Sequence, residues 1–201
     1  MRQREGISFM YLRELILKDR TGVILRPFEN KDLENLFRFF ARIPRSDILI
    51  FKDDVGRLET IESWFTNPMY NKVFQLVALK DDEIIAKGTL HKEGLYWQYA
   101  AEIKLIVDPD YRGRGLGSQM FKTLLVEGLK HSFEKIIVRF TPDNKSFTRM
   151  LDHFGFKPEA VLNCYVTCEE TGEHKDLIIA SYNLEDWKGR FEFYSLAHNG
   201  K

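Results

Sequence analysis

The sequence of 201 residues has no excess of charge of either sign and contains only two cysteines. Its 30 Lys and Arg residues balance 30 Asp and Glu residues, so no overall field favours a nucleic acid or a membrane surface as partner. Cys164 and Cys168 lie in a stretch typical of a strand, where their Cα atoms would be roughly 13 Å apart, too far for a disulfide. Two reduced thiols predict a cytoplasmic location.

Long hydrophobic runs are absent as well. No segment approaches the roughly 20 apolar residues that a membrane-spanning helix needs. Between Ile7 and Leu17 the apolar residues are interrupted by Arg13 and Glu14, so we expect no signal-peptide core there. The length suits a single domain that can bury a core of ordinary size.

The stretch richest in chemical information is Arg112 to Gly117, which reads Arg-Gly-Arg-Gly-Leu-Gly. It follows the apolar run Leu105–Val107 and precedes a helical pattern. A strand, a glycine loop and a helix in this order direct backbone N–H groups toward an anion. Glycine suits such a loop because a Cβ would keep phosphate oxygens away from the backbone. The pattern predicts a pyrophosphate-binding loop; a tight turn that binds nothing is the alternative.

Two familiar phosphate-binding motifs do not fit this loop. A P-loop ends in Gly-Lys-Ser/Thr, a triplet that the sequence lacks. A dinucleotide fingerprint has G-x-G-x-x-G spacing and an acidic residue ending the next strand. Here the spacing is G-x-G-x-G, and Glu134 precedes the next apolar run instead of following it.

Apolar periodicity along the chain predicts a mixed α/β fold, in which helices separate some strands and other strands follow one another directly. Strands are expected at residues 23–26, 73–79, 84–90, 101–107, 135–140, 162–167 and 176–182. Helices are expected at residues 33–41, 61–65, 120–129 and 147–154. Residues 1–20 carry a loose helical stripe and are interpreted as an N-terminal extension, 21–185 as the domain and 186–201 as a tail. In the strand 101–107, Glu102, Lys104 and Ile106 should face opposite to the odd-numbered residues.

Arg112 to Gly117 resembles the R/Q-x-x-G-x-G/A signature of the GCN5-related N-acetyltransferases, the GNAT superfamily. Asn144, followed eleven residues later by Gly155-Phe156, resembles the family's N-x-x-A…Y-x-x-x-G-F segment. The resemblance implies a mixed, mostly antiparallel seven-stranded sheet flanked by helices, with a splay between the fourth and fifth strands. It also implies acetyl-CoA as co-substrate and no metal. The cofactor-binding residues it implies are Leu105, Ile106, Val107, Arg112, Gly113, Arg114, Gly115, Leu116, Gly117, Ser118, Asn144 and Phe147.

The resemblance places the general base at Glu102, on the strand that leads into the glycine loop. A base is needed because a lysine-like amine, with a pKa near 10.4, attacks a thioester only when neutral. The alternative is a surface glutamate held in a salt bridge. His91 and His153 are less favoured, because a lone histidine is usually structural or solvated.

Two positions depart from the family pattern. Leu151 stands where the family often has a tyrosine acid for the departing thiolate, which leaves Tyr111 or Tyr165 as substitutes. Phe147 stands in place of the usual alanine. Backbone N–H groups near Ile106 and Val107 are expected to stabilise the oxyanion.

The acceptor is predicted from weaker signals. Val23–Pro27, Phe39–Ile43 and Ala101-Glu102 resemble the acetyltransferase domain of bacterial Pat-type protein lysine acetyltransferases. Acidic residues are in excess between residues 47 and 64, with Asp53, Asp54, Glu59 and Glu62. We therefore expect a cationic primary amine, a protein lysine or a polyamine, as acceptor and partner, together with a homodimer. The alternatives are a small-molecule acetyltransferase, for an amino acid or antibiotic, and an acyl-CoA-binding sensor.

Overall fold

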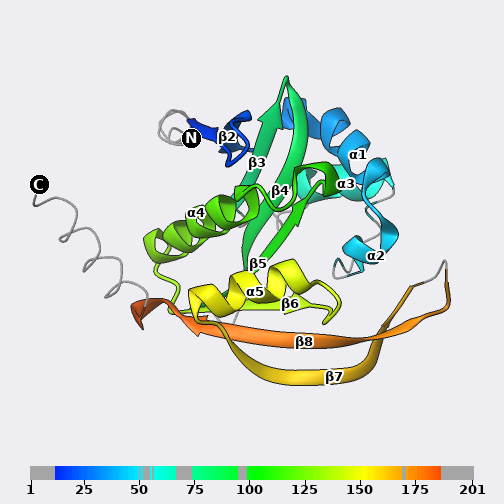
Figure 1. Ribbon diagram of the computed structural model, residues 1–201, viewed down its shortest axis with the longest axis vertical. Coiled ribbons are helices and arrows are strands. Elements are labelled where there is room, and N and C mark those ends of the chain that lie inside the picture. Colours follow the sequence, from blue (N-terminus) through cyan, green and yellow to red (C-terminus); the bar gives the residue numbers. More distant parts are fainter. Residues whose placement is uncertain are drawn as a thin grey trace, which may run out of the picture.

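A single mixed sheet organises the protein, whose computed structural model describes residues 12–49, 51, 55, 57–66, 74–94, 99–168 and 171–186. Eight strands lie in the order β1-β2-β3-β4-β5-β6-β8-β7 (Figure 1). Neighbouring strands are antiparallel except β5 and β6, which are parallel. The strands are β1 Arg13–Ile16, β2 Gly22–Pro27, β3 Phe74–Lys80, β4 Glu83–Lys92, β5 Ala100–Val107, β6 Lys135–Phe140, β7 Lys157–Thr167 and β8 His174–Asn183.

Helices cover both faces of the sheet (Figure 1). One face packs against α4 (Leu116–Lys130) and α5 (Lys145–Phe154). The other packs against α1 (Leu33–Arg42), α2 (Arg45–Ile48) and α3 (Leu58–Thr66). Two apolar clusters result, one on each side of the strands, and each helix buries the stripe that its sequence period places inward.

The alternation predicted along β5 is confirmed. Ala101, Ile103 and Leu105 belong to the apolar cluster under α4 and α5. Ile106 belongs instead to the cluster under α1 and α3, and Glu102 lies on the same face by the two-residue period of a strand. The two faces of β5 therefore serve different helices.

The predicted splay between the fourth and fifth expected strands is also confirmed, between β5 and β6. Their pairing is limited to Ala100 with Lys135, Ala101 with Ile136 and Glu102 with Ile137. Beyond Glu102, β5 continues along β4 while β6 continues along β8. Within the described ranges, the edge of β5 from Ile103 to Val107 that faces β6 consequently has no strand partner.

At the N-terminal end of the described chain, the expected helical stripe is wrong for residues 13–16. They form β1, which pairs with β2 in a register that sets Leu15 opposite Val23. Leu15 and Leu17 are buried while Ile16 is exposed, an alternation with the period of a strand. The sheet thus has one strand more than the seven expected. Residues 1–11 and 187–201 lie outside the described part, and the predicted domain limits stay predictions.

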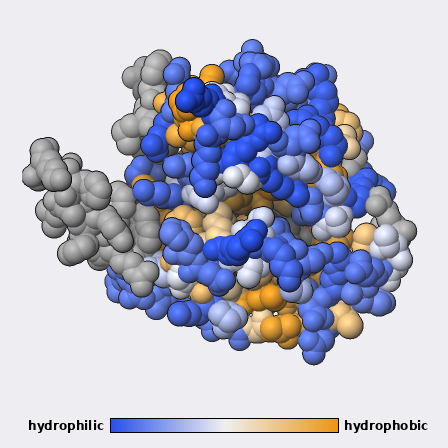
Figure 2. All heavy atoms as spheres, in the orientation of Figure 1, coloured by the Kyte–Doolittle hydropathy of each residue, from blue (hydrophilic) through white to orange (hydrophobic). Residues whose placement is uncertain are grey.

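Both outer strands of the sheet present apolar side chains to solvent. Leu12 and Ile16 are exposed at the β1 edge, and Val161 and Tyr165 along β7. Figure 2 shows a mostly hydrophilic face, with hydrophobic side chains gathered near the β1–β2 edge and along the border formed by β7 and β8. None of the helices in the described ranges is long and apolar enough to cross a membrane.

Candidate active site

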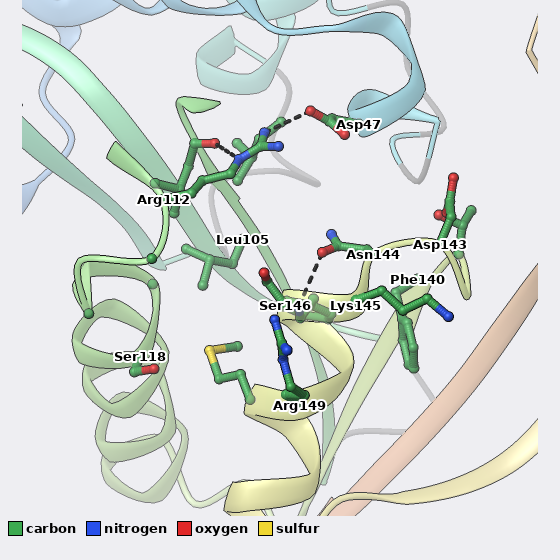
Figure 3. Close-up of a pocket in the computed structure, with 18 of the residues that line it drawn as sticks. Asp47, Leu105, Arg112, Ser118, Phe140, Asp143, Asn144, Lys145, Ser146 and Arg149 are labelled. Atoms are coloured by element: carbon green, nitrogen blue, oxygen red, sulfur yellow. Dashed lines mark hydrogen bonds and ion pairs between the residues drawn. The ribbon is translucent and has the colours of Figure 1, made fainter. Parts of the chain in front are cut away.

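A cavity of about 530 Å³ lies where β5 and β6 separate, beside the first turns of α4 and α5 (Figure 3). Residues from the end of β5, the glycine loop and the start of α5 line it together. Among them are ten of the twelve residues that the resemblance implies for the cofactor: Leu105, Ile106, Val107, Arg112, Gly113, Gly115, Gly117, Ser118, Asn144 and Phe147.

The glycine loop has the backbone geometry that its sequence suggests. Gly113 and Gly115 have φ angles of 74° and 91°, in the left-handed region that a side chain with a Cβ rarely adopts. Gly115 is also the residue that precedes α4, and no side chain caps the helix there. The first N–H groups of α4 therefore remain available to an anion at the cavity wall, where the helix dipole favours negative charge.

The two arginines of the loop have different roles. The Arg112 Nε donates to the carbonyl of Val107 at 2.9 Å, and its Nη2 contacts Asp47 of α2 at 2.7 Å, which fixes the guanidinium against the cavity (Figure 3). Arg114 instead pairs with Asp19 and lies over the ring of Tyr111, 5.2 Å from its centroid. Arg114 does not line the cavity, and neither does Leu116, whose side chain is buried in the core.

The start of α5 forms the opposite wall. The Asn144 side chain accepts a hydrogen bond from the backbone N–H of Phe147 at 3.1 Å and so caps the helix (Figure 3). Phe147 packs against the rings of Phe121 and Phe140. Leu151 is buried in the same apolar cluster, so this position offers no acid. Among the described residues that line the cavity there is no tyrosine, and Tyr111 and Tyr165 lie outside it.

Several lining residues were not expected from the sequence. Lys145 and Arg149 follow Asn144 on consecutive turns of α5, and that spacing is a signal that could have found them. Lys18 reaches the site from the turn after β1, where its backbone N–H donates to the Arg114 carbonyl at 3.1 Å. The complete set of unexpected residues is Lys18, Ser46, Asp47, Phe140, Thr141, Asp143, Lys145, Ser146, Arg149 and Met150.

Glu102 occupies the last paired position of β5 and β6, at the apex of the splay. It is buried, not on the surface, and it is nevertheless held in ion pairs. Its carboxylate is 2.8 Å from the Arg139 guanidinium, 2.9 Å from His91 Nε2 and 3.9 Å from Lys104 Nζ. Glu93 also contacts the Arg139 guanidinium, at 2.8 Å.

These neighbours set the proton affinity of Glu102. Burial alone would raise the pKa of the carboxyl group, but the hydrogen bonds from His91 and Arg139 and the charge of Lys104 outweigh burial and lower the pKa to about 2. Glu102 is therefore a fixed carboxylate at neutral pH. It does not line the cavity, whose nearest described β5 residue is Leu105, about 10 Å along the strand.

A second buried charge lies on β4, where Lys87 pairs with Ile106 of β5. The side chain is 1% exposed, its Nζ donates to the Gln75 amide oxygen, and it lies 4.7 Å from the centroid of the Phe28 ring. Burial lowers the pKa of Lys87 to about 7, although the charge of Asp32 opposes this shift.

Comparison with known proteins agrees with this arrangement. The acetyltransferase (GNAT) family model matches residues 31–156. Among similar solved structures, an N-acetyltransferase from Staphylococcus aureus Mu50 is 18% identical with a TM-score of 0.68, over 81% of this chain and 98% of that one. The GNAT domain of S. lividans PAT is 17% identical with a TM-score of 0.69, over 87% and 98%.

A third similar structure was solved with a ligand. The Salmonella typhimurium protein yncA, with its cofactor acetyl-CoA, is 15% identical with a TM-score of 0.68, over 81% of this chain and 94% of that one. At these identities the likeness establishes a shared fold. The family match, which covers more than half of the chain, carries the assignment.

Proposed function

The chain belongs to the acetyltransferase (GNAT) family, and on that premise we propose that it transfers the acetyl group of acetyl-CoA to a cationic primary amine. The observation that carries the proposal is the splay between β5 and β6, because it connects the expected site of cofactor binding with the expected site of proton removal. Its open end is the cavity beside the glycine loop, and its apex holds the buried Glu102 with its partly exposed partner His91.

The residues of the cavity would hold acetyl-CoA without any metal ion. The N-terminus of α4 and Arg112 suit the pyrophosphate, because backbone N–H groups and a fixed guanidinium both favour phosphate oxygens. The edge of β5 that is unpaired within the described residues suits the pantetheine arm, which carries amide groups. The thioester would then lie along the open edge of β5, where backbone N–H groups near Ile106 and Val107 would meet the oxyanion.

Proton removal at the apex completes the reaction. We assign it to Glu102 together with the imidazole that it contacts, because an amine becomes a nucleophile only after it has lost a proton. The leaving thiolate departs without a tyrosine acid, since its ordinary pKa near 8.5 makes it a good leaving group.

For the acceptor, the exposed acidic residues Glu59 and Glu62 of α3 support a cation. Ile61 of the same helix packs in the cluster that contains Ile106, so α3 lies on the face of the sheet that holds the Glu102 cluster. A protein lysine or a polyamine fits this charge. The acyl-CoA sensor remains the second candidate, because Leu151 replaces the family tyrosine and is buried in the core.

Coenzyme A release from acetyl-CoA is the test. The acceptor panel should contain a lysine peptide, spermidine, free amino acids and an amine antibiotic, with the same peptide blocked at its lysine as the matched control. We expect release above background hydrolysis with the cationic amines and none with the blocked peptide. Tight acetyl-CoA binding without release to any acceptor would favour the sensor instead. We also propose a cytoplasmic location and a homodimer. Analytical ultracentrifugation would measure the oligomeric state.

A further inference from the structure

The members of the apex cluster differ in their access to solvent. The Glu102 side chain is 4% exposed, whereas the His91 side chain, 2.9 Å away on β4, is 25% exposed. The residues stand opposite each other in the β4–β5 register, so both strands hold the contact in place. Of the two, His91 is the group that a substrate or a water molecule can reach.

The contact also determines which ring nitrogen of His91 carries a proton. Glu102 is a carboxylate and can only accept hydrogen bonds. Nε2, which faces it at 2.9 Å, must therefore be the protonated nitrogen, and the neutral ring has its lone pair on Nδ1. Within the described part of the chain, no hydrogen bond engages Nδ1. Nδ1 is thus available as a proton acceptor.

The charges around the ring are balanced while His91 is neutral. Glu102 contacts the ring from β5, Lys104 of β5 and Arg139 of β6 contact Glu102, and Glu93, just after the end of β4, contacts Arg139. Two carboxylates and two cations thus make up the surroundings of the contact between His91 and Glu102. Arg139 bridges Glu102 and Glu93, and this bridge keeps Glu102 aligned with Nε2.

We propose that Nδ1 of His91 takes the proton of the attacking amine, and that Glu102, anchored by Arg139, is the positioning residue that orients the ring. This inference rests on the proposed acetyl transfer. The neutral amine nitrogen forms a C–N bond with the thioester carbon, and the carbonyl electron pair moves to oxygen. When the carbonyl re-forms, the C–S bond breaks with its pair on sulfur. Nitrogen gives its extra proton to Nδ1, and the thiolate is protonated from water.

The experiment measures kcat for a lysine peptide as a function of pH in the parent and in His91→Ala, His91→Gln and Glu102→Gln. The matched control is His131→Gln, an exposed histidine at the end of α4. We expect kcat of the His91 variants to fall about 10²-fold, with a flatter acidic limb and unchanged acetyl-CoA affinity. Added imidazole should restore part of the turnover of His91→Ala. It should not restore Glu102→Gln, in which a ring is still present but no longer oriented.

Three outcomes separate the possibilities. His91→Ala and His91→Gln with kcat within threefold of the parent, and the parent's pH profile, would overturn the role of His91. Turnover lost in His91→Ala but not recovered by imidazole, with a lowered Tm, would also overturn it in favour of a structural contact. If the parent protein itself releases no coenzyme A, the proposed acetyl transfer is wrong. This outcome is seen without any variant, so it is distinct from a failure of the role proposed for His91.

Discussion

Buried carboxylates in the described part of the chain are matched by cations, residue by residue. Asp32 is held by Arg26 at 2.6 Å, Asp108 by Arg42 at 2.7 Å and Glu127 by Lys130 at 2.9 Å. Such pairing offsets the cost of removing a charge from water. Glu102 follows the same rule with more partners, which is why its proton affinity is low and its position fixed.

Lys87 is instead a buried cation with a lowered pKa, so its contribution to the free energy of unfolding should depend on pH. Its pKa of about 7 in the folded protein lies below its ordinary value of 10.5. Between these values the unfolded chain binds a proton that the folded chain does not, so the free energy of unfolding rises as pH rises from about 7 to 10.5. The full destabilisation caused by burying the Lys87 charge is therefore present below pH 7, and it is absent above pH 10.5.

The variant Lys87→Met tests this pH dependence, because the methionine side chain has a similar length but no charge to bury. Its Tm relative to the parent should be higher at pH 7 than at pH 10, because only the parent gains stability across this range. Thermal unfolding at both pH values measures the difference. Lys31→Met, at a side chain that is 71% exposed, is the matched control and should show no such trend. Equal Tm differences at pH 7 and pH 10 for Lys87→Met would contradict a depressed pKa.

At the scale of elements, the sequence predicts what is local. The strand, glycine loop and helix around Arg112 to Gly117 were found because their signals are adjacent in the chain. The faces of β5 followed from its two-residue period. The strand β1 was missed because Ile7, Met10 and Tyr11 extend the apolar pattern of Leu15 into one that also fits a helix.

Contacts between distant segments could not be predicted in this way. The cluster of Glu102, His91 and Arg139 draws its members from β5, β4 and β6, and only the pairing register brings them together. Lys18 likewise reaches the glycine loop only because β1 pairs with β2 and turns back over Arg114. A single sequence does not specify these registers.

The turn after β1 should therefore contribute to cofactor binding. Lys18 lines the cavity, and its Cε lies 3.6 Å from where a Cβ on Gly115 would be. We expect Lys18→Gln to weaken acetyl-CoA binding roughly three- to tenfold, because it removes a cation beside the phosphates. Calorimetry should show a smaller loss at high salt. Arg20→Gln, in the same turn but away from the cavity, is the control; equal losses in both variants would assign the effect to overall charge.

At the scale of the whole molecule, the proposed function assigns the two sides of the splayed sheet to two substrates. The glycine loop and the first turns of α4 and α5 surround the cavity proposed for acetyl-CoA (Figure 3). The Glu102 cluster faces the other side, where α1 and α3 pack. Because the sequence carries no net charge, the proposed attraction of a cationic acceptor would come from local charge on that side.

Local charge predicts how the acceptor responds to salt and to mutation. Of the four acidic residues expected to attract it, Asp53 and Asp54 lie outside the described residues, while Glu59 and Glu62 are exposed on α3. The double variant Glu59→Gln/Glu62→Gln should raise the KM for a lysine peptide several-fold and flatten its dependence on ionic strength, leaving the KM for acetyl-CoA unchanged. Glu185→Gln/Asp186→Asn, at two exposed acids in the helical turn after β8, removes equal charge elsewhere and should change neither value. If both double variants raise the peptide KM equally, the attraction is non-specific. If neither does, the acceptor is bound by groups other than these carboxylates, and a neutral amine becomes the better substrate to pursue.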